Sequence, residues 1–188
     1  MQGWEYQPLG PFLAKNFITS VSPWVITPEA LAPFRVAQPA RAEGDPAVLP
    51  YLWSEDDQQT GALDVELEVL LETEASRRAG RAAHRLSLSS TCHMYWTVAQ
   101  LVAHHSSNGC NLRAGDLFGS GTLSAPTPDG LGSLLEITQG GRVPVELEGG
   151  EKRSFLEDGD EIVLRARARR DGFASIGFGE VRGRVRPA

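Results

Sequence analysis

The chain has 188 residues and a formal net charge of −6, with 41% hydrophobic and 22% charged residues. This length is typical of one domain, which can bury roughly 70% of its unfolded surface. The acidic balance argues against nucleic acid as the main partner. Two cysteines do not make a disulfide framework, and no apolar run approaches the roughly 18 residues of a membrane span. Since no secretion signal is recognisable either, the sequence predicts a cytoplasmic protein with reduced thiols and no membrane partner.

Glycine (20 residues) and proline (12 residues) are spread along the chain, a pattern that suits short strands joined by turns. Residues 37–61 are rich in Pro, Gly, Asp and Ala and are expected to form a loop or an insertion. Residues 63–71 predict a strand, because apolar residues alternate with acids and the two sets occupy opposite faces. Met94–Ser106 predicts the one principal helix, which ends at Asn108-Gly109.

The C-terminal part of the chain completes the predicted β pattern. Leu134–Thr138 is expected to form a strand, with a hairpin turn at Gly140-Gly141 leading into a second strand over 143–147. Residues 161–168 alternate apolar side chains with arginines, which are expected on a solvated strand face, and Asp158-Gly159 is a turn signal. The sequence therefore predicts a fold that is mainly β with one principal helix.

Several strings resemble one family in the same order along the chain. They are WEYQPLGPFLAKNFITSVSPWV from Trp4, MYWTVAQLVAHHSSNGCNLRAGDLFGSGTLS from Met94, LGSLLEIT, FLEDGDEI and the terminal GFGEVRGRVRPA. They are similar to the fumarylacetoacetate hydrolase family, and the similarity is loose only at roughly residues 37–90. The resemblance covers the C-terminal part of the family's catalytic domain over residues 1–188, and it implies a mixed β-sandwich roll that would be incomplete in this chain.

The resemblance also implies an activity. Members of the family are metal-dependent hydrolases that use Mg²⁺ or Ca²⁺ and cleave a carbon–carbon bond of a β-diketo acid. The implied reaction converts 4-fumarylacetoacetate to fumarate and acetoacetate in tyrosine and phenylalanine catabolism. A homodimer is implied as well.

The site residues follow from the resemblance, position by position. Gln2 matches a glutamine of the oxyanion pocket, Tyr6 a tyrosine that contacts substrate, and Thr122 a substrate-binding threonine. Lys15 and Thr19 match positions of the metal loop, and the Lys15 ammonium would stabilise the oxyanion that develops when a diketone is hydrolysed. Without the resemblance, Lys15 is a solvated loop lysine and Thr122 belongs to a plain glycine-rich turn.

Glu136 matches a glutamate that orients a water-activating histidine. A carboxylate in that role fixes the imidazole tautomer and stabilises the imidazolium. The family's catalytic histidine and metal-binding carboxylates lie upstream of the matched positions, and Glu5 is the only acid in the first 20 residues. His104 and His105 lie near the end of the predicted helix, where its dipole favours a cation, and are interpreted as capping and packing residues.

Several functional hypotheses remain open. The chain is either an N-terminally truncated hydrolase that is inactive alone, or a non-catalytic or complementing fragment of a split enzyme. Another member of the superfamily, such as an acylpyruvate hydrolase or oxaloacetate decarboxylase, is a third hypothesis, and a β-rich binding module without metal dependence is a fourth. Ile18 stands where the family has glycine, so either the metal loop avoids positive φ or the metal site is altered.

Overall fold

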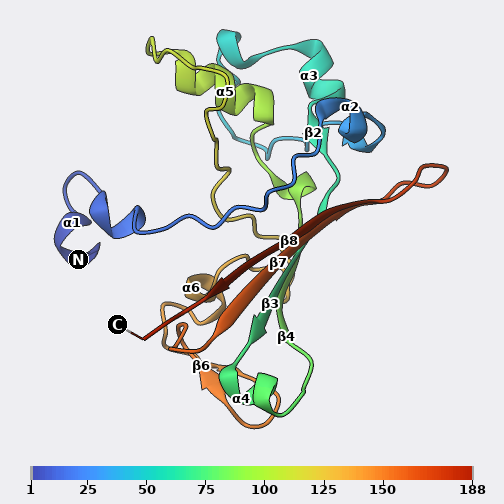
Figure 1. Ribbon diagram of the computed structural model, residues 1–188. Helices are drawn as coiled ribbons and strands as arrows, with labels where there is room; N and C mark the ends of the chain where they lie inside the picture. The colour runs from blue at the N-terminus through green and yellow to red at the C-terminus, as the bar shows by residue number, and fades with distance from the viewer. Residues whose placement is uncertain (1, 188) are drawn as a thin grey trace.

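A computed structural model describes residues 2–187 of the chain. The fold is mixed α/β, with antiparallel sheets and short helices (Figure 1). None of the helices in the described range is long and apolar enough to cross a membrane. In chain order the elements are α1 (Gln2–Glu5), η1 (Leu13–Lys15), α2 (Pro28–Leu31), η2 (Ala32–Phe34), β1 (Arg35–Val36), η3 (Pro50–Leu52), α3 (Glu55–Thr60), β2 (Ala62–Leu63), β3 (Glu66–Glu72), α4 (Glu74–Arg78), β4 (His84–Ser90), η4 (Thr91–His93), α5 (Val98–Ser106), α6 (Leu134–Ile137), β5 (Val145–Glu146), β6 (Lys152–Arg153), β7 (Glu161–Ala168) and β8 (Ile176–Arg184).

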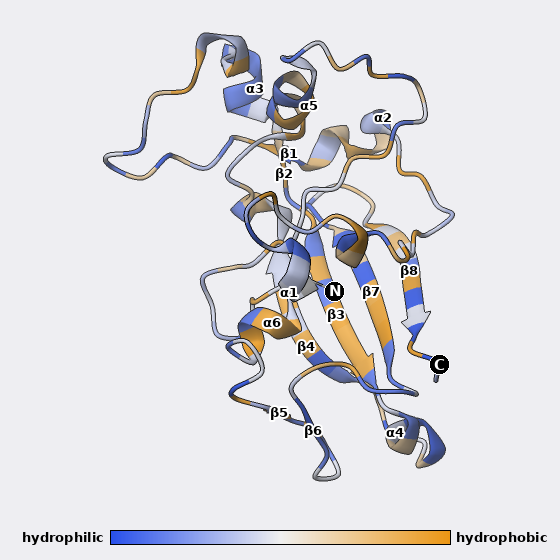
Figure 2. Cartoon of the chain, turned by 90° about the vertical axis from the view of Figure 1, so that its left-hand side faces the viewer, coloured by the Kyte–Doolittle hydropathy of each residue, from blue (hydrophilic) through white to orange (hydrophobic). Residues whose placement is uncertain are grey.

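The central feature is a four-stranded antiparallel sheet with the strand order β4-β3-β7-β8 (Figure 2). Two short ribbons, β1-β2 and β5-β6, accompany it. Figure 1 shows α2, α3 and α5 at the upper end of the sheet and α4 at its lower end. The segment that contains α1 extends to one side of the molecule, away from the sheet.

The strands β3 and β7 form where the sequence predicts them, because their alternation matches the pleat of a sheet. The register pairs Leu67 with Ala166 and Val69 with Leu164, so apolar side chains gather on one face. Glu68 pairs with Arg165 on the opposite face. A bulge between Val69 and Leu70 disturbs the pairing of β3 with β4.

The charged face of the sheet confirms the prediction of solvated arginines. Arg165 bonds Glu180 at 2.7 Å and lies 3.6 Å from Glu68. Arg182 contacts Glu180 at 2.7 Å and the buried Glu161 at 2.9 Å. Cross-strand pairs of opposite charge stabilise this part of the face, whereas Leu70 and Val163 further along it are buried.

The apolar face of the sheet carries two hydrophobic clusters rather than one continuous core. One surrounds Phe34, Val65 and Ala168, whereas the other surrounds Leu71 and Leu86 together with Leu147. Ala168 ends β7 and Ile162, which packs on the second cluster, lies near its start. The clusters therefore cover opposite ends of one sheet face, and the middle of that face is left to other contacts.

The helix predicted from Met94 begins later than expected. Thr97 is the N-cap of α5: its hydroxyl accepts a hydrogen bond from the Gln100 amide, and the Gln100 side chain accepts one from the Thr97 amide. This capping box fixes the start of the helix at Val98, so the prediction was wrong for the four residues before it. The predicted stop is confirmed, since the helix ends at Ser106 and Gly109 has a positive φ of 86°.

The strand predicted over Leu134–Thr138 is wrong, because these residues form α6 instead. Ser133 is the N-cap and its hydroxyl accepts from the Glu136 amide. The Ser-x-x-Glu spacing is a helix-start signal that outweighs the apolar run after it. Gly140-Gly141 consequently lies in a turn after a helix rather than in a hairpin, and the strand that follows is only β5. Asp158-Gly159 does form the predicted turn.

The expected loop over residues 37–61 is only partly irregular. Residues 37–49 contain no helix or strand, whereas η3 and α3 occupy most of the remainder. The α3 helix begins after Ser54, whose hydroxyl accepts a hydrogen bond from the Asp57 amide. This N-cap and the helix dipole together explain why an acidic tract forms a helix. The three acids in the first turn lie at the positive end of the dipole, where negative charge is stabilising.

Candidate functional site

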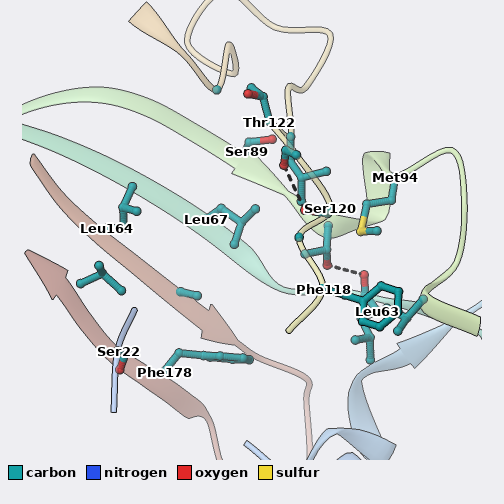
Figure 3. A pocket seen from close by; sticks show the side chains of 18 of the residues that line it. Ser22, Leu63, Leu67, Ser89, Met94, Phe118, Ser120, Thr122, Leu164 and Phe178 are labelled. Atoms are coloured by element: carbon teal, nitrogen blue, oxygen red, sulfur yellow. Dashed lines mark hydrogen bonds between the residues drawn. The ribbon is translucent and has the colours of Figure 1, made fainter. Parts of the chain in front are cut away.

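A groove of about 700 Å³ lies over the uncovered middle of the apolar sheet face. Its floor is formed by side chains from β3 and β7, among them Leu67 and Leu164. The segment from Gly119 to Leu123 forms one wall, and α5 contributes Val98 and Leu101 to another. Figure 3 shows the labelled side chains of this groove. The groove combines an apolar floor with polar side chains on its walls and is therefore the leading candidate for a binding site in the described range.

The N-terminal segment reaches the groove only through Ser20–Trp24. Trp24 packs directly on the backbone of β8, where a Cβ on Gly179 would lie 2.5 Å from Trp24 Cδ1. Only glycine permits this approach, so Gly179 lets the segment dock against the sheet. Residues before Ser20 do not line the groove.

Among the predicted site residues whose side chains are described, Thr122 alone lines the groove. It lies in the wall segment together with Ser120, whose hydroxyl donates to the Gly121 carbonyl at 3.0 Å. Gly132 allows a close crossing here, because a Cβ at that position would lie 2.8 Å from Thr122 Cγ2 and 2.5 Å from the Leu123 carbonyl oxygen. The wall is therefore fixed against the residues that lead into α6.

Glu136 lies on α6 and is joined to this wall by a chain of hydrogen bonds. The Ser124 hydroxyl lies 3.0 Å from both carboxylate oxygens of Glu136 and accepts from the Gly132 amide at 3.0 Å. The Ser133 hydroxyl donates to Glu136 Oε2 at 2.8 Å. The Glu136 carboxylate is exposed and accepts only from serines within residues 2–187, so no histidine of the described structure is its partner.

Lys15, Thr19 and Tyr6 are exposed on the N-terminal segment and contact neither Thr122 nor Glu136 by hydrogen bonds within the described range. Gln2 begins α1, and its side chain lies outside what the structure describes. Within the described side chains, the structure therefore does not bring Lys15, Thr19 and Tyr6 together with the groove.

Glu5 has a clear structural task in this segment. Its carboxylate accepts hydrogen bonds from the amides of Phe12, Leu13 and Ala14 at 2.9, 3.2 and 3.0 Å. The backbone amide of Ala14, followed by those of Phe12 and Leu13, lowers the pKa of Glu5, although burial opposes the shift. This carboxylate caps η1 and so holds the turn that carries Lys15.

The backbone conformation at Ile18 shows how the loop accommodates isoleucine where the family has glycine. The only non-glycine residue with positive φ in the described range is Gln139, at 50°. The loop at Ile18 therefore avoids the left-handed conformation, and isoleucine is accommodated without backbone strain of that kind.

The two helix histidines make packing contacts, as predicted. His104 Nδ1 lies 2.8 Å from the Tyr51 hydroxyl. His105 packs edge-on against Phe118 at 5.1 Å, and its Nε2 lies 3.6 Å from Cys110 Sγ. Their side chains leave α5 in different directions and share no site.

The residues present do not fit a divalent cation. Mg²⁺ and Ca²⁺ take about six or more oxygen ligands, usually including carboxylates. No group of three or more His, Cys, Asp or Glu side chains in residues 2–187 could hold a metal ion. The Lys15 ammonium is no ligand while protonated, and the Glu5 carboxylate is already occupied by backbone amides. The metal-loop positions alone therefore do not make a metal site in this chain.

Sequence reasoning missed Ser124, which links the groove wall to Glu136, and the serines of β4 that line the groove. The Ser133-x-x-Glu136 spacing could have revealed the α6 helix and hence the hydroxyls around Glu136. No sequence signal marked Ser87 and Ser89, because alternating serines in a strand also suit a solvated face.

Comparisons with known proteins agree on one class, the fumarylacetoacetate hydrolases. The family model "Fumarylacetoacetate (FAA) hydrolase C-terminal" matches residues 1–186. The chain is 46% identical to the fumarylacetoacetase of Homo sapiens, 45% to that of Bos taurus and 47% to that of Caenorhabditis elegans. Each match covers 100% of this chain and 42% of the relative.

The chain belongs to the fumarylacetoacetate hydrolase C-terminal family. It spans about 42% of the length of the curated relatives that it matches. The family resemblance predicted from local strings is thereby confirmed over the whole chain, including the region of residues 37–90 where those strings matched loosely.

Proposed function

We propose that this chain forms the C-terminal part of a fumarylacetoacetase catalytic domain, which hydrolyses the carbon–carbon bond of 4-fumarylacetoacetate to fumarate and acetoacetate. The observation that carries the proposal is the 46% identity to the human fumarylacetoacetase along the whole chain. The hydrogen-bonded path from the groove wall through Ser124 to Glu136 supports it, because it holds a carboxylate beside a groove of suitable size. The pathway served would be tyrosine and phenylalanine catabolism.

The proposed roles follow the matched positions. Thr122 would donate to a substrate oxygen, and Tyr6 would contact the substrate from the N-terminal segment. Lys15 and Gln2 would stabilise the oxyanion, a task for which fixed donors are most effective where water is excluded. Glu136 would orient the histidine that activates water, while Thr19 would belong to the metal loop.

The parts that this chain does not assemble are proposed to come from other sequence of the same enzyme. These are the histidine beside Glu136 and the carboxylates that would hold Mg²⁺ or Ca²⁺. The assembled enzyme is proposed to be a cytoplasmic homodimer with a mixed β-sandwich roll, of which the β4-β3-β7-β8 sheet is one part.

A reconstitution assay tests this function. The purified chain, mixed with Mg²⁺ and 4-fumarylacetoacetate, is expected to show no turnover by absorbance. Addition of a polypeptide containing the part of human fumarylacetoacetase that the chain does not match is expected to restore it. In that mixture Glu136→Gln should lower kcat by about 10²- to 10⁴-fold, the usual contribution of acid–base catalysis.

The matched control for this variant is Glu148→Gln, which changes an exposed acid away from the groove and should leave the rate unchanged. Turnover by the chain alone would contradict the proposed division of the site. A restored rate that Glu136→Gln leaves intact would contradict the role of Glu136.

A complementing fragment of a split enzyme is the second candidate, and the exposed N-terminal segment favours it. Trp4, Leu9 and Ile18 are 88%, 80% and 85% exposed. Apolar side chains at this density usually mark a contact surface. Stable association of the two purified polypeptides, measured by ultracentrifugation, would support this candidate, whereas no association at micromolar concentration would oppose it.

A further inference from the structure

Two serine side chains of β4 are buried without a hydrogen-bond partner. Ser87 is 2% exposed and Ser89 is 6% exposed. Neither Oγ atom has a partner within the described part of the chain. Buried hydroxyls normally find a partner, because leaving one unsatisfied costs the free energy of its desolvation. Two such groups, two residues apart on one strand, therefore require an explanation.

Both serines face the groove over the sheet. The register pairs Ser87 with Val69 and Ser89 with Leu67, so all four side chains share the apolar face. All four also line the groove. Figure 3 shows Ser89 on the same side of the groove as Ser120 and Thr122 of the wall segment, with Leu164 on the other side.

The fold itself does not need these hydroxyls. The neighbouring positions of this face are aliphatic, including Leu67 and Val69. Alanine has nearly the size of serine without the polar atom, and it would remove the cost of an unsatisfied group. Ligand-binding sites commonly contain polar groups that lower the stability of the unliganded protein but bind the ligand. An unsatisfied hydroxyl at a concave surface fits this pattern.

The surroundings define the chemistry of the ligand. The floor of the groove is aliphatic, which suits a hydrocarbon chain. Arg165 belongs to a strand that lines the groove, but its guanidinium lies on the opposite face of the sheet, where Glu180 and Glu68 engage it. Because the described residues that line the groove include no free cation, a buried carboxylate is disfavoured there, whereas a neutral carbonyl oxygen can accept from a hydroxyl at little cost. The site therefore matches neutral oxygens on a short chain.

We propose that Ser87 and Ser89 form a keto-oxygen subsite. A short linear keto acid would place its carbon chain over Leu67 and Val69, donate no proton, and accept hydrogen bonds from the two serine hydroxyls. Its carboxylate stays at the open side of the groove. The inference rests on the proposed function for the class of substrate, and it adds which residues select the keto groups. No covalent step is assigned to the serines.

A matched pair of ligands tests the subsite on the chain as it is. The probes are 2,4-dioxopentanoate and pentanoate, which have the same length and differ only in the keto oxygens. Binding is measured by calorimetry and by changes in amide chemical shifts. We expect the dioxo acid to bind at least about tenfold more tightly, because it can accept two neutral hydrogen bonds that pentanoate cannot accept. Ser87→Ala and Ser89→Ala should each reduce this preference by about threefold or more.

The stability of the unliganded variants provides a second readout, which a purely structural serine would move in the opposite direction. Ser87→Ala and Ser89→Ala should each raise Tm by about 2–4 °C, because the unsatisfied hydroxyl is gone. Ser175→Ala is the control, since Ser175 is exposed and lies outside the groove. It should change neither Tm nor the preference between the probes.

Three outcomes would overturn the subsite. Absence of binding of either acid at millimolar concentration is the first. Equal affinity for the two acids is the second outcome. It would mean that the groove is only an apolar cleft, which another part of the polypeptide covers. A fall in Tm for both alanine variants is the third. Failure of the reconstitution assay with a retained keto preference would count against the hydrolase activity and leave the subsite standing.

Discussion

The central sheet and the N-terminal segment obtain their order in different ways. In the sheet, Leu71 is 1% exposed and Val163 is 2% exposed, and each strand pairs with its neighbours over most of its length. In the N-terminal segment, Trp4 and Ile18 remain 88% and 85% exposed, and order comes from a few polar contacts such as those of Glu5. Burial stabilises the first region, whereas one carboxylate and one docked tryptophan position the second.

The difference matters for the site, because most matched catalytic positions lie in the less buried region. Lys15, Thr19 and Tyr6 are all exposed there. Thr122 and Glu136 lie by contrast in segments that Ser124 and Gly132 tie together. The wall at Thr122 and the Glu136 carboxylate are therefore held together within this chain, whereas Lys15, Thr19 and Tyr6 do not line the groove.

The largest expected effect tests the buried charge beside the sheet. Asp160 is 1% exposed and bonds Arg153 Nε at 2.7 Å and Nη2 at 3.0 Å. Asp160→Ala should lower the free energy of unfolding by about 3–5 kcal/mol, because the buried Arg153 would lose its two closest carboxylate contacts and keep only those to Glu151 and Glu157 at 3.3 and 3.4 Å. Urea denaturation measures the change. Asp158→Ala, in the neighbouring exposed turn, should change stability by less than about 0.5 kcal/mol, and equal effects would contradict the prediction.

A second substitution compares the two regions directly. Leu71→Ala should cost about 2–5 kcal/mol, since it leaves a cavity in the cluster with Leu86 and Leu147. Leu9→Ala removes the same atoms from a side chain that is 80% exposed, and it should cost less than about 0.5 kcal/mol. The two midpoints in urea give the comparison. Similar losses would mean that the N-terminal segment is packed as tightly as the sheet.

Acid should weaken the sheet through Glu161. Burial raises the pKa of this carboxyl, but hydrogen bonds and charge from Arg184 and Arg182 outweigh it and hold the pKa below its usual value. A depressed pKa in the folded state means that stability is present above the unfolded value near 4.3 and is lost as pH falls below it. Unfolding free energies at pH 7 and pH 3 measure this loss. Glu161→Gln should reduce the pH dependence over that window, and an unchanged slope would contradict it.

The smallest effect on global stability is expected from Glu5→Gln. The change removes the charge that three backbone amides bind, so the turn carrying Lys15 should open while the sheet stays folded. Limited proteolysis should cleave between residues 6 and 19 faster than in the wild type, with an unchanged urea midpoint. Glu43→Gln, an exposed acid in the loop after β1, is the control, and equal protection of both variants would show that Glu5 does not hold the turn.

The sequence predicted the elements whose order depends on periodicity. The alternation in β3 and β7 needs only a period of two, and it gave both the strands and their charged face. Leu134–Ile137 misled the same reasoning, because four apolar or acidic residues suit a strand or a buried helix equally, and the N-cap Ser133 decided between them. The start of α5 was missed for the same reason, since the Thr97 capping box is a local hydrogen-bond pattern rather than a periodic one.

The candidate site was also predicted only in part from the sequence. Motif similarity identified Gln2, Lys15, Thr122 and Glu136, because residue types at matched positions can be compared without coordinates. It did not predict which of them lie together, since proximity depends on how segments far apart in the chain pack. The carboxylate of Glu136 and the wall at Thr122 are joined by Ser124, a residue that no motif singled out.

The sequence by itself determined the family and the main strands, and it supplied the candidate site positions, which remain a prediction. The tertiary structure alone decided that the apolar sheet face is covered at its two ends and open between them, and that Ser87 and Ser89 lie buried at this opening without partners in the described chain. The physical reason is that periodicity assigns a side chain to a face, whereas only packing decides whether that face meets protein, water or a ligand.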